Sequence, residues 1–207
     1  MSIKIERVDV YGLRSSLRGA RNPMNSWSKS DSYTNEDGVF VVGPNDIAFA
    51  HKLVVAGSDH RKFLRQIFVS MDITAPLYWW KEFDTYKVGT VANSCSTMHK
   101  IHDKAFERDD FSHDRLDEGG LALLDATVAY LEAERQKFLA DKEDRQPWHN
   151  MIQMLPSSYN QMRTVTMNYE NCLNIYHARK NHKLAEWHKL CAEIARLSYF
   201  GQICLGE

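Results

Sequence analysis

Residues 72–96 of this chain read DITAPLYWWKEFDTYKVGTVANSCS, and the prediction of the fold starts from this stretch. It continues an alternation of apolar residues at Ile67, Val69, Met71 and Ile73. An apolar residue at every second position predicts a half-buried strand. Pro76 ends that strand, because proline has no N–H to donate to a neighbouring strand.

A short aromatic helix is predicted to follow the strand. Its apolar side chains are Leu77, Tyr78, Trp79, Trp80 and Phe83. Residues 87–90 then read as a turn and residues 93–96 as a polar loop. A loop presented by a rigid strand and helix is a common position for a functional site. The alternative is that the tryptophans and the proline serve only core packing and chain punctuation, which is their commoner use.

The composition predicts a globular protein with a single domain over residues 1–207. Of its 207 residues, 43% are hydrophobic and 26% are charged, which suits one sizeable core. The formal net charge of -1 gives no overall attraction to nucleic acid or to an acidic membrane, so neither is an expected partner. No apolar run approaches the roughly 20 residues of a membrane-spanning helix.

The N-terminus and the cysteines favour a cytoplasmic location. The opening MSIKIERVDV alternates and is charged, unlike a signal peptide. The four cysteines form no CxxC pair and are predicted to be reduced thiols. They are Cys95, Cys172, Cys191 and Cys204. His99 and His102 lack partners at metal-ligand spacing, so no metal site is predicted.

Two short strands are predicted in the N-terminal part, over residues 3–10 and 39–42, and the first ends at Gly12. A helix follows the second strand, with Asn45 as its N-cap and Gly57 at its end. A basic cluster comes next, made of His60, Arg61, Lys62 and Arg65. Most basic clusters are solvated faces. Because this one lies between a helix end and a buried strand, a ligand-facing role is a stronger candidate here than usual.

Residues 17–38, between these strands, are predicted to form a long polar loop, and such loops are often functional. Arg18, Arg21 and Lys29 lie in it among serine and asparagine side chains, Ser30 and Ser32 included. Donors of this kind suit a phosphate group. A solvated loop is the alternative.

The C-terminal half is predicted to be mostly helical. A helix over residues 121–139 turns one apolar face inward, a short helix lies between Pro147 and Pro156, and a strand follows over residues 159–167. The inward residues of the first helix are Leu124, Val128, Leu131 and Phe138. A final helix over residues 184–200 buries Trp187, Leu190, Ile194 and Leu197.

Asparagine is unusually frequent in the helix predicted over residues 168–179. Its amide competes for backbone hydrogen bonds, which makes it a poor helix former. Asn168 fits an N-cap, whereas Asn171 and Asn174 are interior and suit the edge of a flat heterocycle or a ribose. Arg179 follows Asn168 by 11 residues and therefore projects from nearly the same side of the helix.

The order of these segments resembles the flavin-dependent thymidylate synthase family, ThyX. Residues 73–76, 81–83 and 93–96 look like that family's strand ending in A-P, its R-Q-W and its N-E-x-S. Residues 155–156 look like part of its V-L-P, and His60 falls where the family has a G-H turn.

The most specific part of the resemblance lies near the C-terminus. Asn168, Asn174 and Arg179 are similar to the family's N-x5-N-x4-R helix, and residues 185–187 are similar to its A-Q-W. The resemblance implies an α/β (α+β) fold with a central, mainly antiparallel sheet packed with helices, and with long C-terminal helices.

The resemblance also implies an activity. Members of the family are homotetramers that bind FAD between subunits and transfer a one-carbon unit from methylenetetrahydrofolate to C5 of dUMP, with NADPH re-reducing the flavin. No certain catalytic residue is implied, because position and electrostatics activate the nucleotide. The residues that would contact FAD are Asn168, Asn174, Lys87 and His60. Those that would contact the nucleotide are Glu82, Ser96 at the phosphate, and Arg179 at the uracil edge.

The nucleotide side of the resemblance is incomplete. The family's R-H-R is here residues 85–87, Thr-Tyr-Lys, the glutamate of its N-E-x-S is Ser94, and Ile152 replaces a basic residue. The arginine expected shortly after Ser96 is absent. Each lost charge-assisted hydrogen bond costs about 1.5–3 kcal/mol, so dUMP would bind weakly unless other cations compensate. The candidates are Arg18, Arg21, Arg61 and Arg65. We therefore expect a divergent enzyme whose substrate is dUMP or a related pyrimidine nucleotide.

Three other functions stay open. A catalytically inactive protein on the same scaffold would bind a nucleotide or a protein partner through residues 18–38 and 78–83. Thiol catalysis would need Cys95 to reach His99. A nucleic-acid-binding domain is the weakest alternative, because the chain has no basic aromatic stripe.

Overall fold

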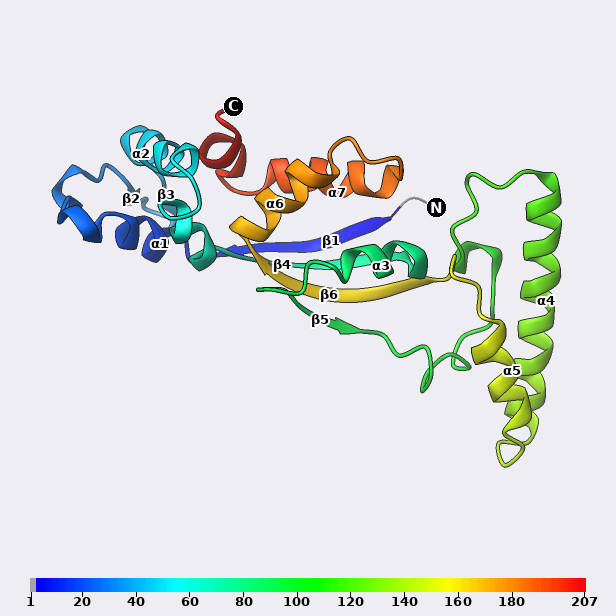
Figure 1. The fold of residues 1–207 in the computed structure, drawn as a ribbon. Coiled ribbons are helices and arrows are strands. Elements are labelled where there is room, and N and C mark those ends of the chain that lie inside the picture. The colour runs from blue at the N-terminus through cyan, green and yellow to red at the C-terminus, as the bar shows by residue number, and fades with distance from the viewer. Residues whose placement is uncertain (1–2) are drawn as a thin grey trace. The chain divides into compact units, whose positions relative to one another are not determined.

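The computed structural model describes residues 3–207 as two compact units (Figure 1). The first unit contains Ile3 and Lys4 together with Ile73–Thr85 and Asn93–Thr164. The second unit contains Ile5–Asp72, Tyr86–Ala92 and Val165–Glu207.

Within residues 3–207, four strands form an antiparallel sheet. Their order is β1 (Lys4–Tyr11), β4 (Phe68–Pro76), β6 (Asn160–Asn168) and β5 (Val91–Ser94). All four strands contribute residues to both units. Helices pack against the sheet, which confirms the predicted fold class.

Strand β4 has the predicted alternation. Its fully buried side chains are Val69, Met71, Ile73 and Ala75, and the residues between them are partly exposed. Pro76 is both the last residue of the strand and the N-cap of helix α3 (Leu77–Phe83). With no N–H and a φ of -67°, it ends the ladder and leads directly into the helix.

Helix α3 contributes three buried aromatic side chains to the first unit. The ring centroids of Trp79 and Phe83 are 5.2 Å apart in a stacked pair, and those of Trp79 and Trp80 are 4.9 Å apart edge to face. The indole N–H of Trp80 donates to the Gln161 carbonyl oxygen at 2.9 Å. Such ring pairs contribute about 0.5–1.5 kcal/mol beyond their burial. The tryptophans therefore serve as core.

The core of the first unit lies between α4 (Glu118–Ala140) and α5 (Gln146–Met154), close to the turn η4 (Arg108–Asp110). The predicted inward face is confirmed, since Leu124, Leu131 and Phe138 are buried and Val128 is partly buried. Helix α4 begins earlier than predicted because the Asp117 carboxylate caps it, accepting from Gly120 N at 2.8 Å. At 23 residues α4 is the longest helix in the described chain. The resemblance implied long helices at the C-terminus, whereas this helix lies in the middle of the chain. No helix in residues 3–207 has the length and apolar character needed to cross a membrane.

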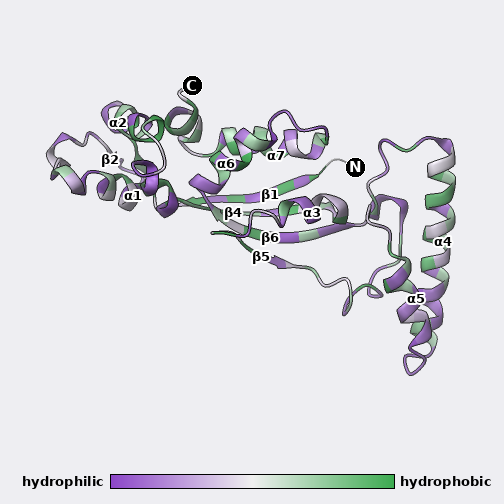
Figure 2. Ribbon diagram, viewed as in Figure 1, coloured by the Kyte–Doolittle hydropathy of each residue, from purple (hydrophilic) through white to green (hydrophobic). Residues whose placement is uncertain are grey.

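The second unit contains most of the remaining helices. They are α1 (Leu13–Ala20), α2 (Pro44–Val55), α6 (Tyr169–Arg179), α7 (Ala185–Arg196) and the 3₁₀ helix η3 (Arg61–Gln66). Helix α6 packs on α7 and on η3, and α1 also packs on η3. The π-helical turn Gly201–Leu205 packs on α2, and its hydrophobic part is green in Figure 2.

The segment over residues 17–38 is more ordered than predicted. Helix α1 extends through Ala20, because Leu17 is buried and the buried Ser16 hydroxyl donates to the Phe63 carbonyl oxygen at 2.9 Å. The 3₁₀ turns η1 (Asn22–Met24) and η2 (Trp27–Lys29) follow, and β2 (Tyr33–Thr34) pairs with β3 (Phe40–Val41). A local sequence pattern carries no information about such distant contacts, which is why a loop was predicted.

Asn45 is not the N-cap of α2, contrary to the prediction. Gly43 holds that position and Pro44 is the first helical residue. The Asp31 carboxylate accepts from Asn45 N at 2.8 Å and from Asp46 N at 3.0 Å. A carboxylate at this end satisfies two free N–H groups and interacts favourably with the helix dipole.

Residues 93–96 were predicted to be a loop, but the first two of them belong to β5, which extends through Ser94. The pairing continues past the strand, with Cys95 N donating to the Met162 carbonyl oxygen at 2.9 Å. The backbone groups of β6 need hydrogen-bond partners on this side, and residues 91–95 supply them.

Replacing Leu131 by alanine is expected to lower the free energy of unfolding by about 2–5 kcal/mol, because its side chain is fully buried and its loss leaves a cavity. Val55→Ala, at the end of α2, is the matched control. Val55 is 72% exposed, so its change should stay within about 0.5 kcal/mol. Urea unfolding followed by circular dichroism measures both, and equal effects would contradict this core.

Candidate functional site

The N-terminus of α6 is closed by a reciprocal pair of asparagines. Asn168 Oδ1 accepts from Asn171 N at 3.0 Å, and Asn171 Oδ1 accepts from Asn168 N at 3.3 Å. Asn168 is therefore the N-cap, as one reading of the sequence predicted. Asn171 completes a capping box. The sequence pattern placed Asn171 in the helix interior, and its role in the capping box explains why an asparagine is found there.

The same two asparagines hold the turn that was predicted over residues 87–90. Asn171 Nδ2 donates to the Val88 carbonyl oxygen at 2.7 Å. Gly89 has a φ of +75°, and a Cβ there would lie only 2.9 Å from Asn168 Nδ2. Glycine is thus required twice, for its backbone conformation and for the close approach. Lys87, at the start of the turn, is exposed.

Arg179 is held against two aromatic rings of the second unit. Its Nε donates to the Tyr86 hydroxyl at 2.8 Å, and its guanidinium carbon lies 4.6 Å from the centre of the Trp187 ring. Asn168 and Arg179 both approach the segment of residues 86–90, in agreement with the predicted common side of α6. The result is a half-buried, planar cation whose orientation is set by its neighbours.

Glu170 neutralises part of the predicted basic cluster. Arg65 Nε donates to Glu170 Oε2, and Arg61 Nε donates to Oε1 at 3.4 Å. Burial would raise the pKa of Glu170, but these two guanidinium groups outweigh it and lower the pKa below its ordinary value. Arg61 also reaches the exposed Asn174, with its Nη2 3.5 Å from Asn174 Oδ1.

The other half of the basic cluster borders a cavity of about 610 Å³ in the second unit. His60, Lys62 and Asp59 are its charged or titratable residues. Its apolar lining includes Met24, Phe49, Leu53 and Phe63. A cavity of this size, with an apolar surface and a few polar groups, has the general form of a small-molecule site.

Glu82 and Ser96, the other two predicted nucleotide contacts, belong to the first unit. Ser96 Oγ accepts from His99 N at 2.9 Å and from Met98 N at 3.2 Å, so its lone pairs serve the local turn and its proton remains for donation. Glu82 is half-buried in the last turn of α3. The five predicted residues His60, Lys87, Asn168, Asn174 and Arg179 are all in the second unit.

The side chains of Arg21, Ser30 and Ser32 are hydrogen-bonded within the protein, whereas the sequence suggested phosphate donors. Arg21 Nε donates to Asp46 Oδ1 at 2.7 Å, and both serine hydroxyls donate to Asp46 Oδ2. Burial would raise the pKa of Asp46, yet these hydrogen bonds lower it. Asp46 is 1% exposed, and a buried carboxylate needs such partners.

Sequence reasoning missed Tyr86, Glu170 and the cavity lining from α1 and α2. Tyr86 and Glu170 lie beside residues that were singled out, but their partners are distant in sequence. The cavity is lined by residues from 19–24 and from 59–66. These ranges are far apart in the sequence, so no local motif predicts that they lie together.

The fold is shared with flavin-dependent thymidylate synthases of known structure. A ThyX from Helicobacter pylori, complexed with FAD and dUMP, matches with a TM-score of 0.68 and 17% identity, over 99% of this chain and 97% of that one. A second structure of Thymidylate Synthase X from Helicobacter pylori, also with FAD and dUMP, matches with a TM-score of 0.72, 16% identity and the same coverage. No protein-family model and no curated protein sequence matches. The likeness establishes the fold.

Asn171→Ala is expected to lower the free energy of unfolding by about 1–2 kcal/mol, because it removes half of the capping box and the contact with Val88. Asn174→Ala in the same helix is the control. Asn174 is exposed and alanine is the better helix former, so that variant should be neutral or slightly more stable. Thermal unfolding compares them. If both variants lose stability equally, α6 is not capped in this way.

Glu170→Gln is expected to destabilise the protein at neutral pH, because it removes a charge paired with Arg61 and Arg65. The pKa of Glu170 is lowered from 4.5 in the folded state. The carboxylate therefore stabilises the fold above about pH 4.5, and this stabilisation is lost as pH falls through the lower folded-state pKa. The difference in Tm between the variant and the natural protein should shrink below pH 4.5. A difference that is independent of pH would contradict the ion pairs.

Proposed function

We propose that this chain is a divergent flavin-dependent thymidylate synthase-like enzyme, which uses FAD to transfer a one-carbon unit to C5 of dUMP or a related pyrimidine nucleotide. The observation that carries the proposal is the match of the fold, over nearly the whole chain, to enzymes solved with FAD and dUMP. A fold does not by itself determine chemistry, so the residues of the second unit matter as well.

The cavity beside His60 fits part of a dinucleotide cofactor. Its apolar surface suits a flat ring, and the exposed Lys62 and His60 offer donors to pyrophosphate oxygens. We propose Asn168, Asn174 and Lys87 as further FAD contacts. Asn174 is exposed on α6 and Lys87 on the adjoining turn, so both side chains are accessible to a ligand.

Bound FAD would supply the redox chemistry of the transfer, with methylenetetrahydrofolate as the one-carbon donor and NADPH as the reductant. The residues of this chain would bind and orient the nucleotide. Arg179 suits the imide edge of a uracil, because two aromatic rings already orient its planar donor groups. Ser96 would donate its free proton to the phosphate, and Glu82 would contact the nucleotide.

We further propose that the chain assembles as a homotetramer. Helix α4 and the residue before its N-cap expose Leu116, Leu123 and Tyr130 at 43%, 70% and 41%. These residues are seven apart, so they form one stripe along the helix. An exposed apolar stripe of this kind is typical of a protein interface.

A catalytically inactive protein that binds a nucleotide or a protein partner is the second candidate. The ion pairs favour it, since three of the four arginines that could replace the missing cations are engaged. Arg21 is paired with Asp46, and Arg61 and Arg65 are paired with Glu170. In the described part of the chain, Arg18 alone of the four has no carboxylate partner. Flavin-dependent oxidation of NADPH would argue against this candidate.

Absorbance in the visible range tests the proposal directly. The purified protein is expected to keep the flavin peaks after FAD is added and free flavin is removed. Lys62→Met should weaken FAD binding roughly tenfold by removing a charge-assisted hydrogen bond, whereas Lys52→Met, on the exposed side of α2, should not. A protein that stays colourless after FAD addition would exclude the flavoenzyme and leave the inactive scaffold.

A further inference from the structure

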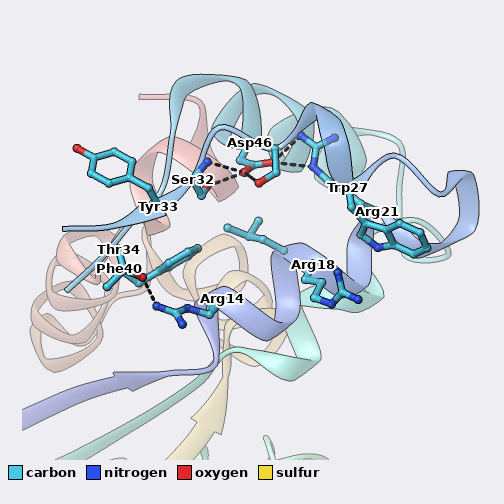
Figure 3. A pocket seen from close by; sticks show the side chains of 11 residues that line it. Arg14, Arg18, Arg21, Trp27, Ser32, Tyr33, Thr34, Phe40 and Asp46 are labelled. Carbon is cyan, nitrogen blue, oxygen red and sulfur yellow. Dashed lines mark hydrogen bonds and ion pairs between the residues drawn. The ribbon is translucent and has the colours of Figure 1, made fainter. Parts of the chain in front are cut away.

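The second unit contains another cavity, of about 300 Å³, between helix α1 and the residues that lead from η2 to β3 (Figure 3). It shares no lining residue with the cavity beside His60. Asp46, with its hydrogen bonds to Ser32 and Arg21, lies on one side, and Arg14 and Arg18 project from α1 on the other.

On the Asp46 side of the cavity, the polar side chains are hydrogen-bonded to one another. Asp46 accepts hydrogen bonds from Arg21, Ser30 and Ser32 and is 1% exposed. The Arg21 guanidinium carbon also lies 4.4 Å from the centre of the Phe49 ring. The carboxylate and Arg21 neutralise each other, so this side offers a ligand neither a free anion nor a free cation.

Arg14 and Arg18 are the exposed cations of this cavity. They lie one helical turn apart on the same face of α1, both are exposed, and within residues 3–207 neither has a carboxylate within salt-bridge distance. Each guanidinium is nevertheless positioned by a ring, Arg14 at 5.2 Å from the centre of Phe40 and Arg18 at 5.3 Å from the centre of Trp27. Arg14 also donates to the Thr34 hydroxyl. Two oriented guanidinium groups on one cavity wall suit an anion with several oxygens.

Exposed aromatic side chains complete the lining. Trp27 is 40% exposed and Tyr33 is 58% exposed. The Trp27 indole N–H donates to Asn22 Oδ1 at 2.9 Å, which fixes the ring at the rim of the cavity. Large aromatic surfaces that face solvent beside exposed guanidinium groups are suited to a flat, polar ring.

We propose that this cavity is a binding site for a nucleoside monophosphate, with the phosphate held by Arg14 and Arg18 and the base against the aromatic side chains. The cavity volume lies at the lower end of the roughly 300–1,000 Å³ typical of small-molecule sites, which favours a mononucleotide over a dinucleotide. The site is separate from the proposed flavin site and does not depend on it.

Calorimetric titration of the full chain with adenosine monophosphate, adenosine and inorganic phosphate tests the proposal. Adenosine monophosphate is expected to bind, and each of the other two should bind at least about tenfold more weakly. Arg14→Gln and Arg18→Gln should each weaken binding of the monophosphate roughly tenfold, and the affinity should fall as salt is raised.

Arg196→Gln is the matched control, since Arg196 is an exposed arginine on α7 outside the cavity, and it should bind like the natural protein. The proposal is overturned if none of the three ligands binds, or if both arginine variants keep full affinity. Inorganic phosphate that binds as tightly as the monophosphate would show an anion site without a base site and would equally overturn it.

Discussion

The second unit depends on the point where strand β6 becomes helix α6. Asn168 caps the helix, while the next residue, Tyr169, donates its N–H to the Ile67 carbonyl oxygen at 2.9 Å. The partner asparagine of the capping box, Asn171, binds Val88, and Gly89 leaves room for both amides. One reciprocal pair of side chains thus closes a helix end and positions a turn, which brings Tyr86 within hydrogen-bond distance of Arg179. The two amides satisfy backbone groups that would otherwise be unpaired, so the loss of Asn171 would leave both the cap and the contact with Val88 incomplete.

The distribution of ion pairs decides which cations can meet a ligand. Asp46 and Glu170 are both largely buried and draw in Arg21, Arg61 and Arg65. A buried carboxylate without such partners would be costly, so these arginines serve stability first. The cations that remain for ligands are those without a buried carboxylate nearby, such as Lys62 at one cavity and Arg14 and Arg18 at another. The resemblance to ThyX enzymes is therefore strong in the fold and altered in the charges that would meet a nucleotide.

Elements with a strong local pattern could be predicted well. The alternation in β4, the proline before α3 and the inward leucines of α4 all act within a few residues of chain. The partners of Arg21 and Arg61, the strand β5 and the Asp31 cap of α2 could not be predicted, because each joins residues far apart in sequence. For the candidate site, the sequence identified Asn168, Asn174 and Arg179 as a group. It did not reveal Tyr86, which orients the arginine, nor the cavity that His60 borders.

The amino-acid sequence by itself determined where β4 ends, where α3 begins and which face of α4 is buried, because hydrophobic periodicity and proline act locally. Tertiary structure decided which polar side chains are left to bind a ligand. Arg18 and Arg21 are three residues apart in the same polar segment, yet Arg21 is 4% exposed and paired with Asp46 while Arg18 stays exposed on α1. The packing of α1 and α2 sets this difference. A buried charge is costly without an oppositely charged partner, whereas an exposed charge remains available to a ligand.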